Sequence, residues 1–269
     1  SIEKPKPNRS KELKKINKNL IVFTAIKELG YNPTNKYKNL KKIIKKKEID
    51  IGHNCNNRCR FCLHKDEKEW RKKSTDKIKK DIECTKNFDK IVFTGGEPTM
   101  RKDLPTLIKH AKNEGFKIIE LESNGRRFFY NDYTQKIISS GVTKFKISLH
   151  GSTAKIHEEL TRTADSFSQT IKGIKNLVNL DQVVAVNCVI TKHNYKDLPN
   201  LADLLININV SQIKFIFPNK NNVTNFQEIK NNIPKIGEIK PYLNKALNKI
   251  ENQDKIGLTE GVTISNQDR

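Results

Sequence analysis

The sequence has no run of 18 or more apolar residues, and so it predicts no membrane-spanning helix. Its first residues, SIEKPKPNRSKELKK, also lack the apolar core of a secretory signal peptide. These two absences predict a cytoplasmic protein with no membrane span. In a reducing compartment of this kind, crowded cysteines indicate metal binding or catalysis rather than disulfide bonds.

Arginine is scarce, although the formal net charge of the chain is +22. Only nine of the 52 lysine and arginine residues are arginine, and residues 1–50 hold 15 basic residues against five acidic ones. A basic chain can bind nucleic acid or an anionic surface, but bidentate recognition of phosphates and bases favours arginine. We therefore interpret the lysines mainly as a solvated surface, with recruitment of RNA or a peptide by the basic N-terminus as the alternative.

Short β-rich runs alternate with helical patterns through most of the chain. The runs are 49–52, 90–94, 117–121, 144–149, 183–191 and 213–217. The helical patterns begin at Ser74 or Thr75, at Pro105, near 167, at Pro199 and at about Pro241. Six strands that alternate with helices favour a parallel sheet, which right-handed crossovers curl into a barrel. The predicted fold class is α/β, a partial (β/α)6 barrel of the TIM type.

Composition and patterning divide the chain into three parts. Residues 1–47 are predicted to form a basic, partly disordered and partly helical extension, with an amphipathic helix over Lys11–Leu29. Residues 48–218 form the predicted β/α core. Residues 219–269 are predicted to form a C-terminal helical segment and a polar tail.

Three of the five cysteines lie in the stretch HNCNNRCRFCLH, at Cys55, Cys59 and Cys62. Three thiolates could hold a zinc ion, with His64 as the fourth ligand. They could also hold an iron–sulfur cluster, which usually takes four cysteines and here would keep one iron open. The spacing C-x3-C-x2-C by itself leaves both interpretations standing.

Other unusual residues follow the predicted strands at their C-terminal ends, where β/α barrels carry their reacting groups. Gly95, Gly96, Glu97 and Pro98 follow the second strand, Ser123, Asn124 and Gly125 follow the third, Ser148 and His150 close the fourth, and Asn187 lies in the fifth. The cysteines follow the first strand. We therefore expect these residues to meet at one edge of the sheet.

The sequence resembles the radical S-adenosylmethionine (SAM) superfamily over roughly residues 48–218. The C-x3-C-x2-C loop, with aromatic Phe61 before the third cysteine, is the signature of that superfamily. The stretch FTGGEPT at 93–99 resembles its second motif, and ESNG, ISLHG and VNCVIT resemble later parts of the same core.

The resemblance implies an enzyme in which Cys55, Cys59 and Cys62 hold a 4Fe–4S cluster and SAM binds the open iron. An electron from a reductant such as ferredoxin or flavodoxin would cleave SAM to a 5′-deoxyadenosyl radical, which takes hydrogen from the substrate. A fourth thiolate would block the position of SAM, which accounts for its absence. Related enzymes process peptides, RNA, lipids or cofactor precursors, so the substrate stays open.

The resemblance also assigns SAM-binding residues near the cysteines. Gly95 and Gly96 would let backbone carbonyls approach the SAM ammonium, and the Glu97 carboxylate would add to the same contact. Phe61 would lie beside the adenine. Simple packing of Phe61, and an ordinary glycine turn at Gly95 and Gly96, are the alternatives.

Polar residues at later strand ends would complete the SAM site. Ser123 and Asn124 would bind the SAM carboxylate or ribose, or else only form a turn. Ser148 would face the same site, Arg162 would bind the carboxylate, and Asn187 would contact the ribose. The alternatives are a surface salt bridge for Arg162 and a satisfied buried amide for Asn187.

The remaining candidates are one histidine and the two cysteines outside the loop. His150 is a candidate acid–base catalyst. Cys84 and Cys188 are isolated, so we interpret both as packing residues and predict no second cluster within this sequence. The alternative function is a zinc-stabilised, basic nucleic-acid-binding protein without catalysis.

Overall fold

The computed structural model describes residues 46–62, 73–85, 87–217 and 231–251. The predicted Lys11–Leu29 helix, His64 and the polar tail lie outside these ranges. No helix among the described residues is long and apolar enough to cross a membrane.

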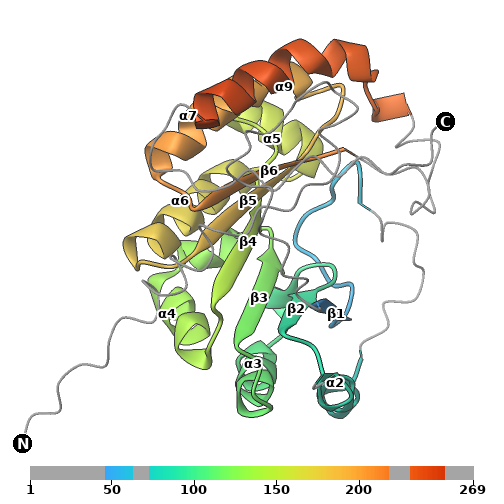
Figure 1. The fold of residues 1–269 in the computed structure, drawn as a ribbon, viewed down its shortest axis with the longest axis vertical. Coiled ribbons are helices and arrows are strands. Elements are labelled where there is room, and N and C mark those ends of the chain that lie inside the picture. The colour runs from blue at the N-terminus through green and yellow to red at the C-terminus, as the bar shows by residue number, and fades with distance from the viewer. Residues whose placement is uncertain (1–45, 63–72, 86, 218–230, 252–269) are drawn as a thin grey trace, which may run out of the picture.

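Six parallel strands form one sheet, and they follow one another in the order β1 to β6 (Figure 1). They span Lys46–Asp50, Lys90–Thr94, Ile118–Ser123, Lys144–Ser148, Val184–Val189 and Gln212–Ile216. Each strand pairs with its sequence neighbour, and β1 and β6 are the two edges of the sheet. This is the predicted open, partial barrel, since the edge strands do not pair with each other.

Helices cover the outer face of the sheet (Figure 1). All the helices of the described ranges lie between strands in the chain, except the last, which follows β6. They are α2 (Thr75–Glu83), α3 (Leu104–Asn113), α4 (Asn131–Ser140), α5 (Ala154–Thr161), α6 (Ser166–Asn179), α7 (Leu198–Ile208) and α9 (Ile236–Glu251). The Ser74 hydroxyl caps α2 by accepting from the Lys77 amide at 3.2 Å. The sequence analysis did not place α4 or α5.

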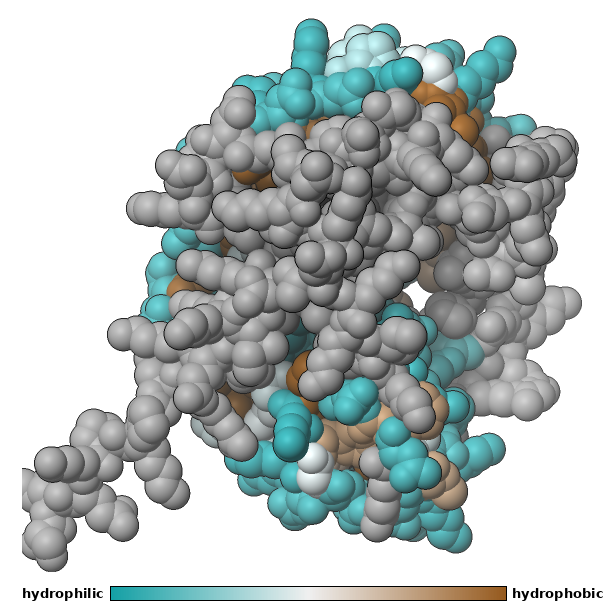
Figure 2. All heavy atoms as spheres, viewed as in Figure 1, coloured by the Kyte–Doolittle hydropathy of each residue, from teal (hydrophilic) through white to brown (hydrophobic). Residues whose placement is uncertain are grey.

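Alternate residues of each strand face these helices and build the core. Phe93, Phe145 and Phe215 are among the largest buried side chains, and Ile78 and Ile82 of α2 pack into the same core. This alternation is what a half-buried strand requires, because successive side chains point to opposite faces. On the side that Figure 2 shows, the coloured surface is mostly hydrophilic, with apolar residues in small separate areas.

The two isolated cysteines have different surroundings. Cys188 is fully buried in β5, as expected of a packing residue. Cys84 is exposed at the C-terminal cap of α2, so its interpretation as a packing residue was wrong. The helix stripe of Ile78 and Ile82 already fills the core side of α2, which leaves Cys84 on the solvent side.

The last helix also differs from its prediction. Helix α9 begins at Ile236, so that Pro241 lies inside it and not at its first turn. A proline there removes one intrahelical hydrogen bond at a cost of roughly 3 kcal/mol. Buried Ile239, Leu243 and Leu247 lie on one stripe of α9, which packs against α7. Burial of that stripe offsets the cost and extends the helix through the proline.

Candidate functional site

Two loops meet at the C-terminal edge of the sheet, one after β1 and one after β2. The Gly96 amide donates to the Gly52 carbonyl at 2.9 Å, and the Glu97 amide donates to the Asn54 carbonyl at 2.8 Å. The predicted proximity of Gly95–Pro98 to the cysteine loop is therefore present. The backbones of the two loops thus continue the pairing of β1 with β2 beyond the ends of the strands.

Gly95 and Gly96 are required where these loops touch. A Cβ atom at Gly95 would lie 2.3 Å from the Gly52 carbonyl oxygen, and one at Gly96 would lie 2.3 Å from that of His53. Gly95 also has a φ of +142°, which disfavours other residues. Close packing of the two backbones thus explains why glycine is needed at both positions, which the sequence analysis did not consider. The contact of Gly95 and Gly96 with SAM stays a prediction.

Glu97 is buried and joins the ends of β2 and β3. Its Oε1 accepts from the Thr99 amide at 3.0 Å, the Thr99 hydroxyl at 2.5 Å and the Ser123 hydroxyl at 2.8 Å. Its Oε2 accepts from the Asn124 amide at 2.6 Å. Burial raises the pKa of Glu97, although these donors oppose the shift. These four donors equal the number of hydrogen bonds that a carboxylate can accept. The contact of Glu97 with SAM stays a prediction, and it would require the SAM ammonium to share the carboxylate with these donors.

The three cysteine thiols of the loop are free and half-buried. Burial raises the pKa of Cys55 to about 11 and that of Cys59 to about 12, so both thiols are protonated at neutral pH without a metal. A bound metal would deprotonate them, because thiolates are the metal ligands. After burial, Cys55 and Cys62 also raise the pKa of Cys59, because two neighbouring thiolates repel each other.

The donor set of this loop is three thiols within eight residues. Three thiolates suit an iron–sulfur cluster with one open iron, and with a fourth ligand they would also suit zinc. The residues of the loop therefore fit the cluster that the resemblance implies, and His64, the candidate fourth ligand of zinc, lies outside the described residues.

The cysteine loop is held from the side of α5. The amides of Arg58 and Arg60 donate to the carbonyls of Thr161 and Leu160, each at 2.9 Å. Carbonyls in the last turn of a helix have no partner within the helix, so they are available to the loop. This contact fixes the segment that carries Cys59.

Arg126, which the sequence analysis missed, holds the loop from the side of β3. Its guanidinium donates to the Asn56 carbonyl and, at 2.9 Å, to the Asn57 side-chain oxygen. Its Nε donates to Gln169 of α6 at 2.7 Å. Its position directly after the ESNG stretch was the only signal in the sequence.

Ser123 and Asn124 make protein contacts next to this loop. Ser123 accepts from the Gly125 amide at 3.0 Å, in addition to its bond with Glu97. The Asn124 side chain donates to the Asn56 side-chain oxygen at 2.6 Å. The turn formed by Ser123–Gly125 is therefore present, and the SAM contacts of Ser123 and Asn124 stay predictions.

Ser148 and Asn187 are neighbours on β4 and β5, paired in register. Both side chains are half-buried. The Asn187 side-chain oxygen is buried and has no hydrogen-bond partner among the described residues. A buried acceptor of this kind calls for a donor from a ligand or water, which fits the predicted contact of Asn187 with SAM.

His150 lies behind Phe61, and their ring centroids are 4.7 Å apart in an edge-on arrangement. The Val189 amide donates to His150 Nδ1 at 3.3 Å, which leaves the proton of the neutral ring on Nε2. Burial lowers the pKa of His150 well below its usual range. A neutral ring with one nitrogen bonded to the backbone supports Phe61 by packing, and catalysis by His150 stays a prediction.

Arg162 caps the C-terminus of α5 in the left-handed conformation, with a φ of 53°. Its amide donates to the Glu158 carbonyl at 2.8 Å, and its side chain is exposed. It directly follows Thr161, which binds the cysteine loop. The binding of the SAM carboxylate by Arg162 stays a prediction.

The inner face of the sheet carries an ion network that the sequence analysis also missed. Glu120 is fully buried, pairs with Lys90 at 2.5 Å and contacts Lys146. Burial alone would raise the pKa of Glu120, but Lys146, Lys144 and Lys90 together lower it to about 2. Lys146 also pairs with Glu122 at 3.1 Å. The predicted strands showed the charges, but only their register brings the opposite signs together.

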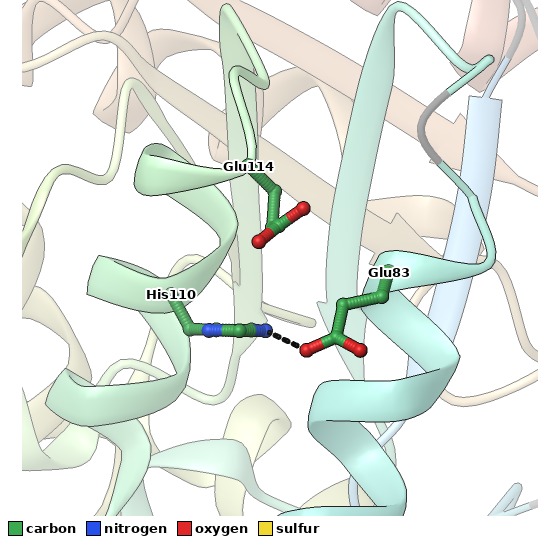
Figure 3. Close-up of side chains that lie close together, drawn as sticks. All are labelled: Glu83, His110 and Glu114. Atoms are coloured by element: carbon green, nitrogen blue, oxygen red, sulfur yellow. Dashed lines mark ion pairs between the residues drawn. The ribbon is translucent and has the colours of Figure 1, made fainter.

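One further group of possible metal ligands lies elsewhere. Glu83, His110 and Glu114 come from the C-terminal ends of α2 and α3, with His110 paired to Glu83 at 3.0 Å (Figure 3). Both helices run back from the site, so this group lies at the N-terminal end of the strands. It is explained as an ion pair that ties two neighbouring helices.

Fold and site together define a class of protein: an open parallel β/α barrel with a three-cysteine loop at the C-terminal edge of its strands. The chain belongs to the radical SAM superfamily, whose family model matches residues 49–205. The cofactors of this superfamily are a 4Fe–4S cluster and SAM.

Curated relatives include probable GTP 3′,8-cyclases. One from Saccharolobus islandicus is 30% identical over 172 residues, which cover 62% of this chain and 55% of the relative. One from Methanopyrus kandleri is 28% identical over 204 residues, which cover 74% of this chain and 65% of the relative. The chain thus spans about half the length of the first of these relatives.

Solved structures confirm the fold. Streptococcus suis SuiB bound to S-adenosylmethionine aligns with a TM-score of 0.67 and 18% identity, over 78% of this chain and 48% of SuiB. TYW1 with a bound lysine–pyruvate adduct aligns with a TM-score of 0.58 and 16% identity, over 78% of this chain and 74% of TYW1. At these identities the likeness shows the fold alone.

Proposed function

We propose that this protein is a radical SAM enzyme, in which Cys55, Cys59 and Cys62 hold a 4Fe–4S cluster that binds SAM at its open iron. The observation that carries the proposal is the backbone pairing of the cysteine loop with Gly96 and Glu97, at 2.9 and 2.8 Å. This pairing places three thiols beside the strand ends on which the polar residues lie. A donor set of three thiols suits a cluster with one open iron.

Cys55, Cys59 and Cys62 would hold the cluster, which in its reduced form would provide the electron for cleavage of SAM to a 5′-deoxyadenosyl radical. The part of the chain is to hold and orient the reactants. The carbonyls at the end of α5 and the Arg126 side chain hold the loop at two different places. A preorganised loop would hold the three thiolates in fixed positions.

The SAM molecule would lie over the ends of β4 and β5. The unpaired Asn187 oxygen would accept from a ribose hydroxyl, with Ser148 beside it in register. Phe61, fixed edge-on against His150, would pack beside the adenine. We also propose roles for Gly95, Gly96, Glu97, Ser123, Asn124 and Arg162 in SAM binding, as the family resemblance implies.

The experiment is anaerobic reconstitution with iron and sulfide, followed by reduction with SAM present. We expect a brown protein with about four irons per chain that forms 5′-deoxyadenosine, measured by mass spectrometry. Cys59→Ser should abolish both results. Cys84→Ser is the matched control, because that exposed thiol lies at the end of α2 and outside the loop. A colourless protein that takes up one zinc and leaves SAM intact would support the alternative, a zinc-stabilised nucleic-acid-binding protein.

The reductant and the substrate are further parts of the proposal. A one-electron donor such as ferredoxin or flavodoxin would supply the cluster. The names of relatives provide two substrates to test first, because the curated relatives are probable GTP 3′,8-cyclases and SuiB was crystallised with a precursor peptide. A true substrate should accelerate the formation of 5′-deoxyadenosine, and a substrate deuterated at the reacting carbon should pass deuterium to it.

The basic N-terminal extension is a separate part of the proposal. Deletion of residues 1–47 tests whether they recruit RNA or a peptide, because a protein without them should then bind such a substrate more weakly.

A further inference from the structure

Arg126 connects three segments at the edge of the site. Its guanidinium donates to the Asn56 carbonyl and to the Asn57 side chain at 2.9 Å, both between Cys55 and Cys59. On its other side, Nε donates to Gln169 of α6 at 2.7 Å. Hydrogen bonds from a charged, planar donor are shorter and stronger than neutral ones, and they fix the orientation of their acceptors.

A second contact from the same turn strengthens this attachment. The Asn124 side chain donates to the Asn56 side-chain oxygen at 2.6 Å and accepts from the Arg126 amide at 3.1 Å. Asn56 is therefore held at both its carbonyl and its side chain. Asn124 itself is fixed by the bond from its amide to buried Glu97. The attachment thus extends from the cysteine loop to the core of the sheet.

The charge of Arg126 lies beside the first cysteine of the loop. Its guanidinium donates to Asn56 and Asn57, the two residues that directly follow Cys55. Its side chain is half-buried, so water screens the charge less than at the surface. A permanent cation at this position favours negative charge on the group that the cysteines hold.

We propose that Arg126 is a positioning residue for the cysteine loop and that its charge raises the reduction potential of the cluster held there. The inference rests on the proposed function, since it requires the cluster. Reduction adds one electron from the external ferredoxin-type or flavodoxin-type donor and so makes the cluster more negative. A fixed cation beside a sheltered site stabilises the reduced form more than the oxidised form.

The test compares Arg126→Gln and Arg126→Lys with the wild-type protein. In the loaded proteins, the midpoint potential is measured by a redox titration followed by electron paramagnetic resonance. We expect Arg126→Gln to disfavour reduction at least tenfold, a shift of about 59 mV to lower potential for one electron. Arg126→Lys keeps the charge and should stay closer to the wild-type potential. In the proteins without cluster, hydrogen exchange of residues 55–60 should be faster in both variants.

Arg127→Gln is the matched control. Arg127 is the next residue, carries the same charge and stacks on the Tyr133 ring, with its Cζ 4.4 Å from the ring centroid. Its loss should leave both the potential and the exchange of the loop near wild-type values. An equal shift in Arg127→Gln would overturn the proposal, because it would show only a general effect of charge.

The outcomes also separate this inference from the proposed function. Unchanged potential and unchanged loop exchange in Arg126→Gln would overturn the inference even if the wild-type enzyme cleaves SAM. Failure of Arg126→Gln to load a cluster supports the positioning role if loop exchange rises and Arg126→Lys restores loading, and otherwise counts against it. If the wild-type protein takes up no cluster, the proposed function fails.

Discussion

Gly96 shows how a single residue decides whether the two loops of the site can meet. A methyl group at this position would lie 2.3 Å from the His53 oxygen and 2.7 Å from the Asn54 oxygen. Both atoms belong to the backbone, so they cannot move aside as a flexible side chain would. The sequence showed the glycine, but the contact that requires it comes from the other loop.

Gly96→Ala should therefore destabilise the protein by about 1–3 kcal/mol, the usual range for overpacking. Urea denaturation of the protein without cluster measures this change. Gly237→Ala is the control, because a Cβ there meets no atom within 4 Å and the residue lies in α9. It should stabilise by roughly 0.5–1 kcal/mol. If Gly96→Ala were as stable as the wild type, this result would contradict the close approach of the two loops.

Arg126 and Glu97 connect the loops of the site, each through hydrogen bonds to several neighbouring groups. Glu97 accepts from Thr99, Ser123 and Asn124, and Arg126 donates to Asn56 and Asn57. Both act by fixing the groups that carry the cysteines. At this scale the site is a set of backbone positions held by a buried carboxyl group and a half-buried guanidinium.

At the scale of elements, α9 contains a proline that its packing tolerates. Pro241→Ala restores a backbone donor opposite the Gly237 carbonyl, so we expect a gain of about 1–3 kcal/mol in the free energy of unfolding. Pro105→Ala is the control, since Pro105 lies in the first turn of α3, where no donor is missing. It should change stability little or lower it slightly. A loss of stability in Pro241→Ala would contradict a continuous α9.

Strands β3 and β4 carry an acid-sensitive ion network. The pKa of Glu120 is about 2 in the folded protein, below its ordinary value of 4.5. The stability that it contributes is therefore present above pH 4.5 and is lost as the pH falls toward 2. Its size is on the order of 3 kcal/mol.

Glu120→Gln should accordingly reduce the acid dependence of unfolding, measured by denaturation between pH 6 and pH 3. The variant should also be less stable at neutral pH, because Lys90 and Lys146 lose a buried partner. Glu238→Gln is the control, because Glu238 lies at an exposed position of α9 and outside the ion network of Glu120. This variant should keep the acid dependence of the wild type. An identical pH slope in Glu120→Gln would show that another group controls it.

At the scale of the whole molecule, the open barrel gathers the ends of all six strands at one edge. The cysteine loop is attached there to β2, β3 and α5, so binding of a cluster should stabilise the fold as a unit. We expect the melting temperature to rise on reconstitution and to fall when a chelator removes the iron. Anaerobic calorimetry measures both changes. Cys59→Ser should show neither, and an equal melting temperature with and without cluster would contradict the coupling.

The sequence by itself determined the six strands, the parallel barrel and the identity of the cysteine loop. These follow from local periodicity and from a motif of eight residues, and a resemblance was enough to name the family. The strand boundaries were predicted to within a few residues, whereas α4, α5 and the start of α9 were not predicted. The periodicity of α9 was visible, but not that burial would offset the cost of Pro241.

Only the tertiary structure decided which residues support the site. Arg126 lies 70 residues from Asn56, and Asn124 lies 68 residues from it. Glu120 meets Lys146 through the register of two strands. No local pattern predicts such pairs, because each depends on where the chain returns after a helix. The sequence therefore determined the chemistry of the loop, and the packing of distant segments decided its geometry.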